Sequence, residues 1–270
     1  MNTLRERYPE HFRGIDRQRV FTIAVAAAAL VLLLYGMGEL GFFDGKLLAG
    51  MGRLAEIAGL MLPPDPGSWG HARVFAVALV ETVAIALLGT LAAAVLALPV
   101  GLLAARNVTA QRIVRFLSRR SLDTIRSVDV LVWALIWINV VGLGPFAGAL
   151  AIMTSDIGAF GKLFSEAIEA ADRKPVEGIA STGGGHLLGI RFGILPEVFP
   201  VLASQVLYYF ESNTRSATII GIVGAGGIGL YLAEAIRTLE LQQTSFIILM
   251  ILVTVAAIDF VSSKLRFAMM

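Results

Sequence analysis

The segment PVEGIASTGGGHLLGIRFGILP, residues 175–196, separates two long apolar runs and decides how the chain folds. Pro175 suits the first turn of a helix, where Glu177 complements the positive end of the helix dipole, and Gly183–Gly185 end that helix. A second short element is expected over His186–Phe192, ended by the Leu-Pro pair that follows. Two short helices joined by a glycine bend predict a compact polar knob between the apolar runs.

The composition places those apolar runs in a bilayer. Hydrophobic residues make up 57% of the 270 residues and charged residues 16%, whereas a soluble domain carries roughly 25% charged residues. The mean hydropathy of +0.78 is more than one buried core accounts for, so several segments must lie in lipid. The absence of Cys excludes disulfides, thiolate metal sites and cysteine nucleophiles. The predicted fold class is therefore all-α and polytopic, with about six transmembrane helices.

Six spans are predicted from the uncharged stretches. The first follows a group of arginines and is too long for a cleavable signal. The breaker Gly142-Leu-Gly144-Pro145 divides a long uncharged stretch into the third and fourth spans, with one tilted span over 130–155 as the alternative. The segment Lys46–Leu62 has helical apolar spacing and is expected along the outer interface. The predicted spans are Val20–Met37, Val74–Ala105, Ser127–Val141, Phe146–Leu163, a fifth that starts near Pro196, and Leu241–Ile258.

Charge placement predicts the sidedness of this map. Seventeen Lys and Arg residues fall on one side and four on the other, with Arg215 within the membrane. Cytoplasmic loops hold the excess of positive residues, so both termini and the polar loop are expected in the cytoplasm. The same distribution explains the pI near 9.1 without nucleic-acid binding. Residues 1–72 should form the cytoplasmic N-terminus, first span and outer linker, and 73–270 the transmembrane domain with its polar loop at 166–196.

The polar loop also carries a family signature. Permease subunits of ATP-binding-cassette importers have, in such a loop, Glu-Ala-Ala, three residues, Gly, nine residues, Ile, one residue and Leu-Pro, and this sequence resembles them. Gly178 and Ile179 replace the two Ala, and Gly193 stands where Ile is expected. The expected intervals are kept by Glu177, Gly183, Leu195 and Pro196. Three other segments look like phosphonate-importer permeases, namely Leu98–Asn107, Val141–Gly148 and Arg215–Gly229.

The resemblance implies a type I importer permease of the bacterial plasma membrane, working as a dimer of this chain. Its implied cargo is phosphonate, phosphite or a related oxyanion, delivered by an external binding protein. Two ATPase subunits would bind ATP and Mg and grip the coupling loop, so this chain would have no cofactor, no metal and no catalytic residue. The coupling-loop residues would be Glu177, Gly178, Ile179, Gly183, Leu195 and Pro196.

Other functions remain open from the residues themselves. A permease of the same superfamily could carry another small solute, such as an amino acid. An ion-coupled secondary transporter would be expected to show paired intramembrane charges and a repeat between its halves, and no such repeat is seen. A membrane-bound oxidoreductase would use the glycine run near the end of the fifth span as a nicotinamide site.

That glycine run fits the dinucleotide fingerprint, but no alternating strand and helix units surround it. A close-packed, bendable outer element near a dimer axis is the favoured interpretation, because glycines let backbones approach one another. The tentative gate residues are Gly224, Gly226, Gly227 and Gly229. His71 and His186 lack acidic or His neighbours at ligand spacing, so no metal site is predicted.

Polar residues in the fifth span, at membrane depth or near its outer boundary, are candidates for the substrate pathway: Glu211, Asn213, Arg215 and Ser216. Ionisable groups are expensive there and need partners. Glu211 and Arg215 are four residues apart and are expected to pair on a helix. The pair is either structural, or Arg215 faces a passing oxyanion, since a guanidinium matches pairs of oxygens. Glu81 and Asp259 are expected to pack or to lie at interfaces.

Overall fold

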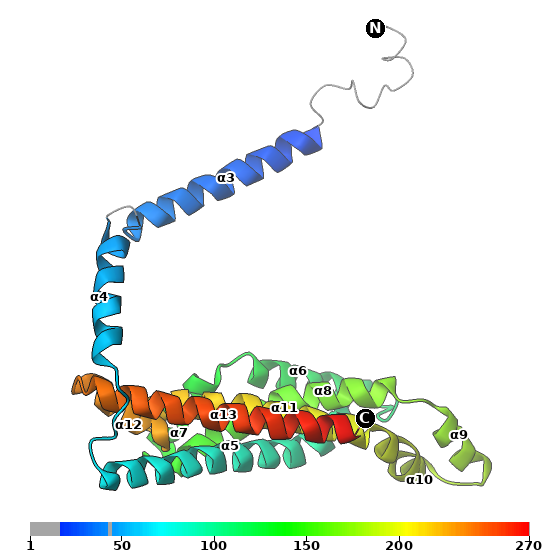
Figure 1. Cartoon of the computed structure of the whole chain (residues 1–270). Coiled ribbons are helices and arrows are strands. Elements are labelled where there is room, and N and C mark those ends of the chain that lie inside the picture. Colours follow the sequence, from blue (N-terminus) through cyan, green and yellow to red (C-terminus); the bar gives the residue numbers. More distant parts are fainter. Residues whose placement is uncertain (1–16, 43–44, 270) are drawn as a thin grey trace, which may run out of the picture. The chain divides into compact units, whose positions relative to one another are not determined.

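The computed structural model describes residues 17–42 and 45–269, and the described residues are helical or loop, without a strand. The arginines at positions 5, 7 and 13, which belong to the group before the first predicted span, lie outside these residues. The chain forms two compact units that divide between Leu60 and Met61. The all-α prediction is confirmed, and Figure 1 shows the helices along the chain.

The first unit contains two helices, α3 (Arg17–Glu39) and α4 (Lys46–Leu60). The apolar side chains of α3 are exposed along its length, as expected of a helix that meets lipid. It covers the whole predicted first span and extends by a few residues at each end. Helix α4 matches the predicted helical segment of the linker and ends two residues earlier than predicted.

The second unit is a bundle in which α5, α8 and α11 form the centre. Glycines allow α5 and α8 to approach closely: a Cβ added at Gly89 would lie 2.8 Å from Cβ of Ile152, and one at Gly101 would lie 3.1 Å from Cβ of Phe164. Small residues at such contacts let membrane helices pack without a hydrophobic driving force. The helices of this unit are α5 (Trp69–Ala104), α6 (Arg112–Arg126), α7 (Val130–Val141), α8 (Pro145–Ala170), α9 (Lys174–Ser181), α10 (His186–Leu188), α11 (Leu195–Ile222), α12 (Ile228–Arg237) and α13 (Leu241–Met269).

The break between the third and fourth predicted spans is confirmed. Helix α7 ends at Val141, and Gly142 and Gly144 have φ of 93° and 135°, a region that favours glycine. Pro145 then begins α8, where its missing N–H costs nothing. One tilted span across 130–155 is therefore wrong.

The third span differs from the prediction at its start. Helix α7 has only 12 residues, and it is preceded by α6, an amphipathic helix of 15 residues that the span map treated as part of an inner loop. The two helices meet at an 88° bend, and Asp129 caps α7 by accepting a hydrogen bond from the backbone N–H of Leu131. Asp129 therefore stabilises the start of α7 directly after the bend.

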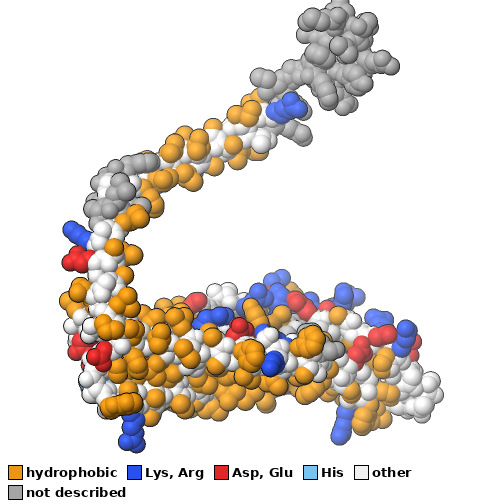
Figure 2. All heavy atoms as spheres, in the orientation of Figure 1, with side chains coloured by type: hydrophobic (Ala, Val, Ile, Leu, Met, Phe, Trp, Pro, Cys, Tyr) orange, Lys and Arg blue, Asp and Glu red, His pale blue; other side chains and the backbone are white. Residues whose placement is uncertain are grey.

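Four helices of the described residues are long and apolar enough to cross a membrane: α3, α5, the continuous stretch His186–Ile222, and α13. The bent pair of α6 and α7 makes a fifth if it counts as one span. Helix α8 has 26 residues but is not among them, and it carries Asp156 and Lys162. Figure 2 shows hydrophobic side chains over much of the visible side of the bundle, as expected of a surface in contact with lipid.

The ends of the bundle are distinct. Helix α13 continues past Asp259 to Met269, and Figure 1 shows its last turns beside α10, at the end of the bundle that carries α9. We call this the α9 end. The opposite end holds the starts of α5 and α13, joined by a hydrogen bond from the backbone N–H of Asp65 to the carbonyl of Gln242. The polar loop and the C-terminal helix end therefore lie on the same side, as the span map predicts.

Candidate functional site

The polar loop forms the predicted helix. Helix α9 begins with Pro175 in its first turn, has Glu177 in that turn, and contains no buried residue. Gly183, with φ of 83°, ends it, and its N–H donates to the carbonyl of Ala180 at 3.0 Å. An exposed helix that projects beyond the bundle presents its side chains to a partner.

Two departures from the family signature are explained by packing within this loop. A Cβ at Gly193 would lie 3.0 Å from Cγ2 of Val176, so the Ile of the signature would not fit here without movement. A Cβ at Gly184 would lie 2.5 Å from Cγ2 of Ile179, the larger residue that replaces an Ala of the signature. The glycines thus make room for the two β-branched residues of α9.

The second loop element differs from its predicted end. The expected element His186–Phe192 does not stop before Leu195-Pro196. Helix α10 passes into a π-helical turn over Gly189–Ile194 and then directly into α11. Pro196 lacks an N–H and would clash in a regular helix interior, and a widened turn before it lets the helical path continue. Helix α10 is therefore continuous with α11, and α9 packs against this stretch through Val176 at Gly189 and Gly193.

The predicted pair Glu211–Arg215 is confirmed but is not the shorter contact. Arg215 Nη2 lies 3.7 Å from Glu211 Oε1, whereas Nη1 of Arg266, in the last turn of α13, lies 3.2 Å from Glu211 Oε2. The side chain of Glu211 is 10% exposed and that of Arg266 21%, while Arg215 is 56% exposed. Glu211 is thus neutralised mainly by α13, and Arg215 keeps an accessible guanidinium.

This contact also fixes the depth of the pair. Arg266 lies near the end of α13, which is at the α9 end of the bundle. Of the two levels expected for Glu211, membrane depth or the outer boundary of the span, the contact favours membrane depth. Sequence reasoning counted Arg266 only among the cytoplasmic positive charges and did not identify it as the partner of Glu211. The two residues are 55 positions apart, and no local spacing connects them.

Asn213 faces a different part of the bundle. Its Nδ2 donates to Asp156 Oδ2 at 2.5 Å and to Thr90 Oγ1 at 2.8 Å, so one amide joins α5, α8 and α11. All three residues are buried. Sequence reasoning missed Asp156, although a single carboxylate within an apolar run was the available signal. Asn213 and Arg215 were predicted to line the same pathway, but they face different parts of the structure.

The hydroxyls of this part of α11 bond to their own helix. Ser216 Oγ donates to the carbonyl of Ser212 at 3.4 Å, and Thr214 Oγ1 donates to that of Phe210 at 3.0 Å. Such bonds satisfy hydroxyls within a membrane helix. Arg215 is thus the predicted pathway residue with the most accessible donor groups.

The glycine run forms a tight turn between α11 and α12. Gly224, Gly226 and Gly227 have φ of 101°, 85° and 77°. The N–H of Gly144 donates to the carbonyl of Gly224 at 3.0 Å, and a Cβ at Gly226 would lie 2.7 Å from Cα of Pro145. Two of the segments that carry the family resemblance, 141–148 and 215–229, therefore pack directly on each other.

Helix α5 caps the start of α12. Glu81 Oε1 accepts a hydrogen bond from the N–H of Gly227 at 2.9 Å, and Thr82 Oγ1 accepts one from that of Ile228 at 2.8 Å. These side chains satisfy N–H groups that a helix start leaves unpaired. Glu81 thus has a structural role. Since the described residues contain no strand, the dinucleotide interpretation of the run lacks the sheet it requires.

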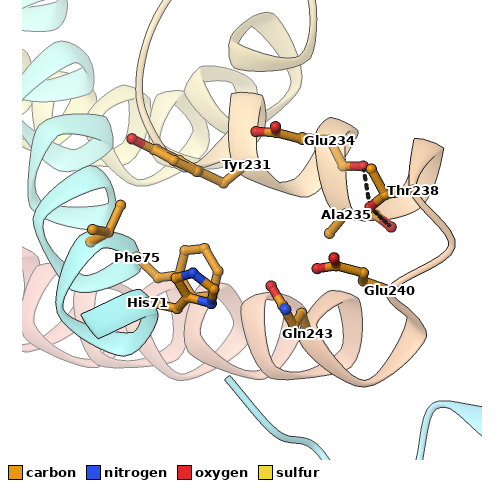
Figure 3. Close-up of a pocket in the computed structure, with 9 residues that line it drawn as sticks. His71, Phe75, Tyr231, Glu234, Ala235, Thr238, Glu240 and Gln243 are labelled. Carbon is orange, nitrogen blue, oxygen red and sulfur yellow. Dashed lines mark hydrogen bonds between the residues drawn. The ribbon is translucent and has the colours of Figure 1, made fainter. Parts of the chain in front are cut away.

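The pocket drawn in Figure 3 lies at the end opposite α9. It has a volume of about 260 Å³ and is bounded by the starts of α5 and α13 and the end of α12. His71, Glu234, Glu240 and Gln243 supply its polar groups, beside the rings of Phe75 and Tyr231. None of the predicted coupling, pathway or gate residues lines it.

Comparisons with known proteins agree with this geometry. A family model described as the inner membrane component of binding-protein-dependent transport systems matches residues 97–266. PtxC of Stutzerimonas stutzeri, named a phosphite transport system permease protein, is 36% identical over 84% of this chain and 82% of its own. HtxC of the same organism, named as a candidate permease of a phosphite transport system, is 38% identical over 93% of this chain and 87% of its own.

Solved structures show the same fold. A chain from the MetNI methionine ABC transporter, in inward-facing conformations, superposes with a TM-score of 0.65 at 18% identity. The match covers 75% of this chain and 99% of that one. At this identity the likeness establishes the arrangement of helices and not the cargo.

Proposed function

Since this chain belongs to the family of inner membrane components of binding-protein-dependent transport systems, it is a membrane-spanning permease of an ATP-driven importer, and we propose that it carries phosphite, a phosphonate or a related oxyanion. The observation that carries the cargo is the similarity to two proteins named for phosphite transport, which extends over more than four fifths of each chain. A permease of this family has no covalent chemistry of its own to perform.

The accessible guanidinium of Arg215 supports an oxyanion cargo. Glu211 is already neutralised by Arg266 at 3.2 Å, so the positive charge of Arg215 is only partly compensated, at 3.7 Å. A guanidinium presents paired donors that match two oxygens of a phosphite or phosphonate. The contact must be weak enough to release the anion, and a half-exposed Arg meets that need better than a fully desolvated one. In this proposal Ser216 and Asn213 shape the wall and do not bind the anion.

The coupling loop transmits force from the partner subunits. In this proposal two ATPase subunits, which bind ATP and Mg, receive α9 with Glu177, Gly178 and Ile179 on its surface. Gly183 supplies the bend, and Leu195-Pro196 passes the displacement into α11 through the π-helical turn. Support comes from the absence of buried residues in α9 and from the unbroken path between α10 and α11.

The gate in this proposal is the glycine turn. Gly226 and Gly227 pack against Pro145 of α8 and Thr82 of α5, and Gly229 packs against α11. Gly224 lies against Leu143. A movement of α11 would therefore shift the turn against Glu81 and Pro145. Alternating access would then couple the loop at one end of α11 to the turn at its other end. A second copy of this chain would supply the other half of the pathway, with both termini in the cytoplasm and an external binding protein at the opposite face.

Uptake tests the cargo. The permease would be produced with its own ATPase and binding protein in cells that lack other phosphorus importers, and entry of radiolabelled phosphite measured against unlabelled phosphite, methylphosphonate, phosphate and methionine. We expect competition by phosphite or methylphosphonate at the lowest concentrations. Competition by methionine alone, or labelled uptake that persists without the ATPase subunit, would contradict the proposal.

A further inference from the structure

Helix α6 has an apolar face that the other described helices of the second unit do not cover. Ile113, Phe116 and Leu117 are 68%, 59% and 58% exposed. Their spacing of three and four residues places them on one side of the helix. The same 15 residues contain five arginines and one aspartate, so the helix is strongly basic as well as amphipathic.

The opposite face of α6 is fixed against α8. A Cβ at Gly158 would lie 2.7 Å from the backbone N of Arg126, and one at Gly161 would overlap the side chain of Leu122. Leu122 is 2% exposed. Because the helix is held this closely, it cannot rotate to bury its apolar face without losing that packing.

Contacts of Arg119 fix the level of α6 along the bundle. Its Nε donates to the carbonyl of Ala104 at 3.0 Å, where α5 ends, and its Nη2 lies 2.5 Å from Glu169 Oε1, one residue before the end of α8. The first half of α6 therefore lies beside the ends of two bundle helices, at the α9 end, and its second half follows α8 as far as Gly158, where Arg126 lies. An amphipathic helix at this level meets the boundary between acyl chains and headgroups.

Two arginines of α6, Arg112 and Arg115, lack a partner for their charge among the described residues, whereas Arg126 acts on Asp123 beyond ion-pair distance. Arg119 and Arg120 pair with Glu169 and Asp123. Across residues 17–42 and 45–269, no carboxylate lies within ion-pair distance of Arg112, Arg115 or Arg126. Figure 2 shows Lys and Arg side chains gathered over the part of the bundle where Figure 1 labels α6. These unpaired guanidinium groups are available to bind anions outside the protein.

Arg120 shows how charge and apolar surface combine. Its guanidinium carbon lies 5.5 Å from the centre of the Phe116 ring, above the apolar face. A long basic side chain that covers apolar surface with its stem and keeps its charged head at the interface is typical of a helix lying in a membrane surface. The apolar trio and the charged border are thus parts of one surface.

We propose that α6 is a binding surface for anionic phospholipids in the leaflet at the α9 end of the bundle. Ile113, Phe116 and Leu117 insert among the acyl chains, and Arg112 and Arg115 contact headgroup phosphates, for which guanidinium groups are well matched. Because α6 is packed on α8, which leads into α9, bound lipid holds the helix that carries the coupling loop. Binding of lipid to α6 would be the same whichever solute the permease carries.

The test measures lipid retained by the purified permease–ATPase complex. The complex would be exchanged into detergent with phosphatidylglycerol or phosphatidylcholine of the same acyl chains, and bound lipid counted by native mass spectrometry. We expect the wild type to retain phosphatidylglycerol, and the R112Q/R115Q variant to bind it at least about tenfold more weakly, since each basic residue near an anionic surface contributes about 1 kcal/mol. The matched control R73Q/R237Q removes two exposed arginines at the opposite end and should bind as the wild type does.

Further variants separate lipid binding from folding and from protein contacts. The charge-preserving variant R112K/R115K should keep most of the phosphatidylglycerol, which would show that the loss in the Gln variant comes from the removed charge. Equal retention by the wild type and the Gln variant would overturn the proposal. It would also be overturned if I113S/F116S/L117S released the ATPase subunit while lipid retention stayed the same, because a protein partner would then cover this face.

Discussion

Two glycine-rich segments of this permease have similar compositions and opposite surroundings. Around Gly183–Gly185 the loop bends at the surface: a Cβ at Gly183 or Gly185 would meet nothing within 4 Å, and one at Gly184 would meet only Ile179 of the same loop. In the turn at Gly224–Gly229, a Cβ at any of the four glycines would meet backbone or side chains of neighbouring residues. Glycine supplies conformational freedom in the first segment and close approach in the second. Composition alone therefore does not distinguish a hinge from a packed joint.

The largest expected effect comes from filling the packed joint. In Gly229→Ala the new Cβ would overlap the carbonyl oxygen of Thr218 and approach Gly221 of α11, and backbone atoms cannot move aside as a flexible side chain can. Overpacking of this kind costs about 1–3 kcal/mol. We expect a lower thermal unfolding midpoint and a lower yield of purified permease.

The matched control for that variant is Gly178→Ala in the coupling loop. No atom lies within 4 Å of a Cβ at Gly178, which is in the helical region of α9. Helix propensity favours the Ala by up to about 1 kcal/mol. If both variants unfolded at the same temperature, the contrast between a packed and an open glycine segment would be lost.

The next effect concerns the open segment. In Glu177→Arg a positive charge replaces a negative one in the first turn of α9, against the helix dipole and on a surface where no residue is buried. We expect the variant to insert and to unfold as the wild type does but to lose co-purification with the ATPase subunit. Normal co-purification with normal transport-linked ATP hydrolysis would remove α9 from the docking surface.

A smaller effect is expected where α5, α8 and α11 are joined by one amide. Asp156→Leu removes the acceptor for one hydrogen bond of Asn213, which keeps its bond to Thr90. Hydrogen bonds between membrane helices contribute about 1 kcal/mol, so the unfolding midpoint should fall modestly. Asp156→Asn retains an acceptor oxygen and should stay near the wild type. A larger loss in the Asn variant would show that the carboxyl itself is required.

The local and the long-range features differ in how far the sequence predicts them. Helix starts and breaks were predicted by residues with local rules: Pro175, Gly183, and the Gly-Leu-Gly-Pro breaker before α8. The contact of Glu211 with Arg266 and the cluster at Asp156 join distant helices, and no spacing in one sequence shows which faces meet. Helix α6 was missed because its arginines were treated as loop charges and not tested for amphipathic spacing.

The π-helical turn belongs to the same group of long-range effects. A Leu-Pro pair normally ends a helix, and the sequence indicated that it would. The structure keeps the path helical because α9 packs against this turn at Gly189 and Gly193, where Val176 would meet any Cβ. The second half of the loop and the fifth span therefore form one continuous helical stretch, whereas the sequence pattern predicted two separate elements.

The smallest expected effect tests whether the two glycine segments act on a shared pathway. Arg215 lies on α11 between them and is half exposed, with Glu211 as a distant partner at 3.7 Å. Exposed charges of this kind contribute up to about 1 kcal/mol, so Arg215→Ala should slow phosphite uptake roughly fivefold without dissociating the complex or lowering its unfolding midpoint. Arg215→Lys keeps the charge without the planar pair of donors, and should recover part of the rate. Unchanged uptake in the Ala variant would make Arg215 a structural residue, and the path of the anion would then have to avoid this face of α11.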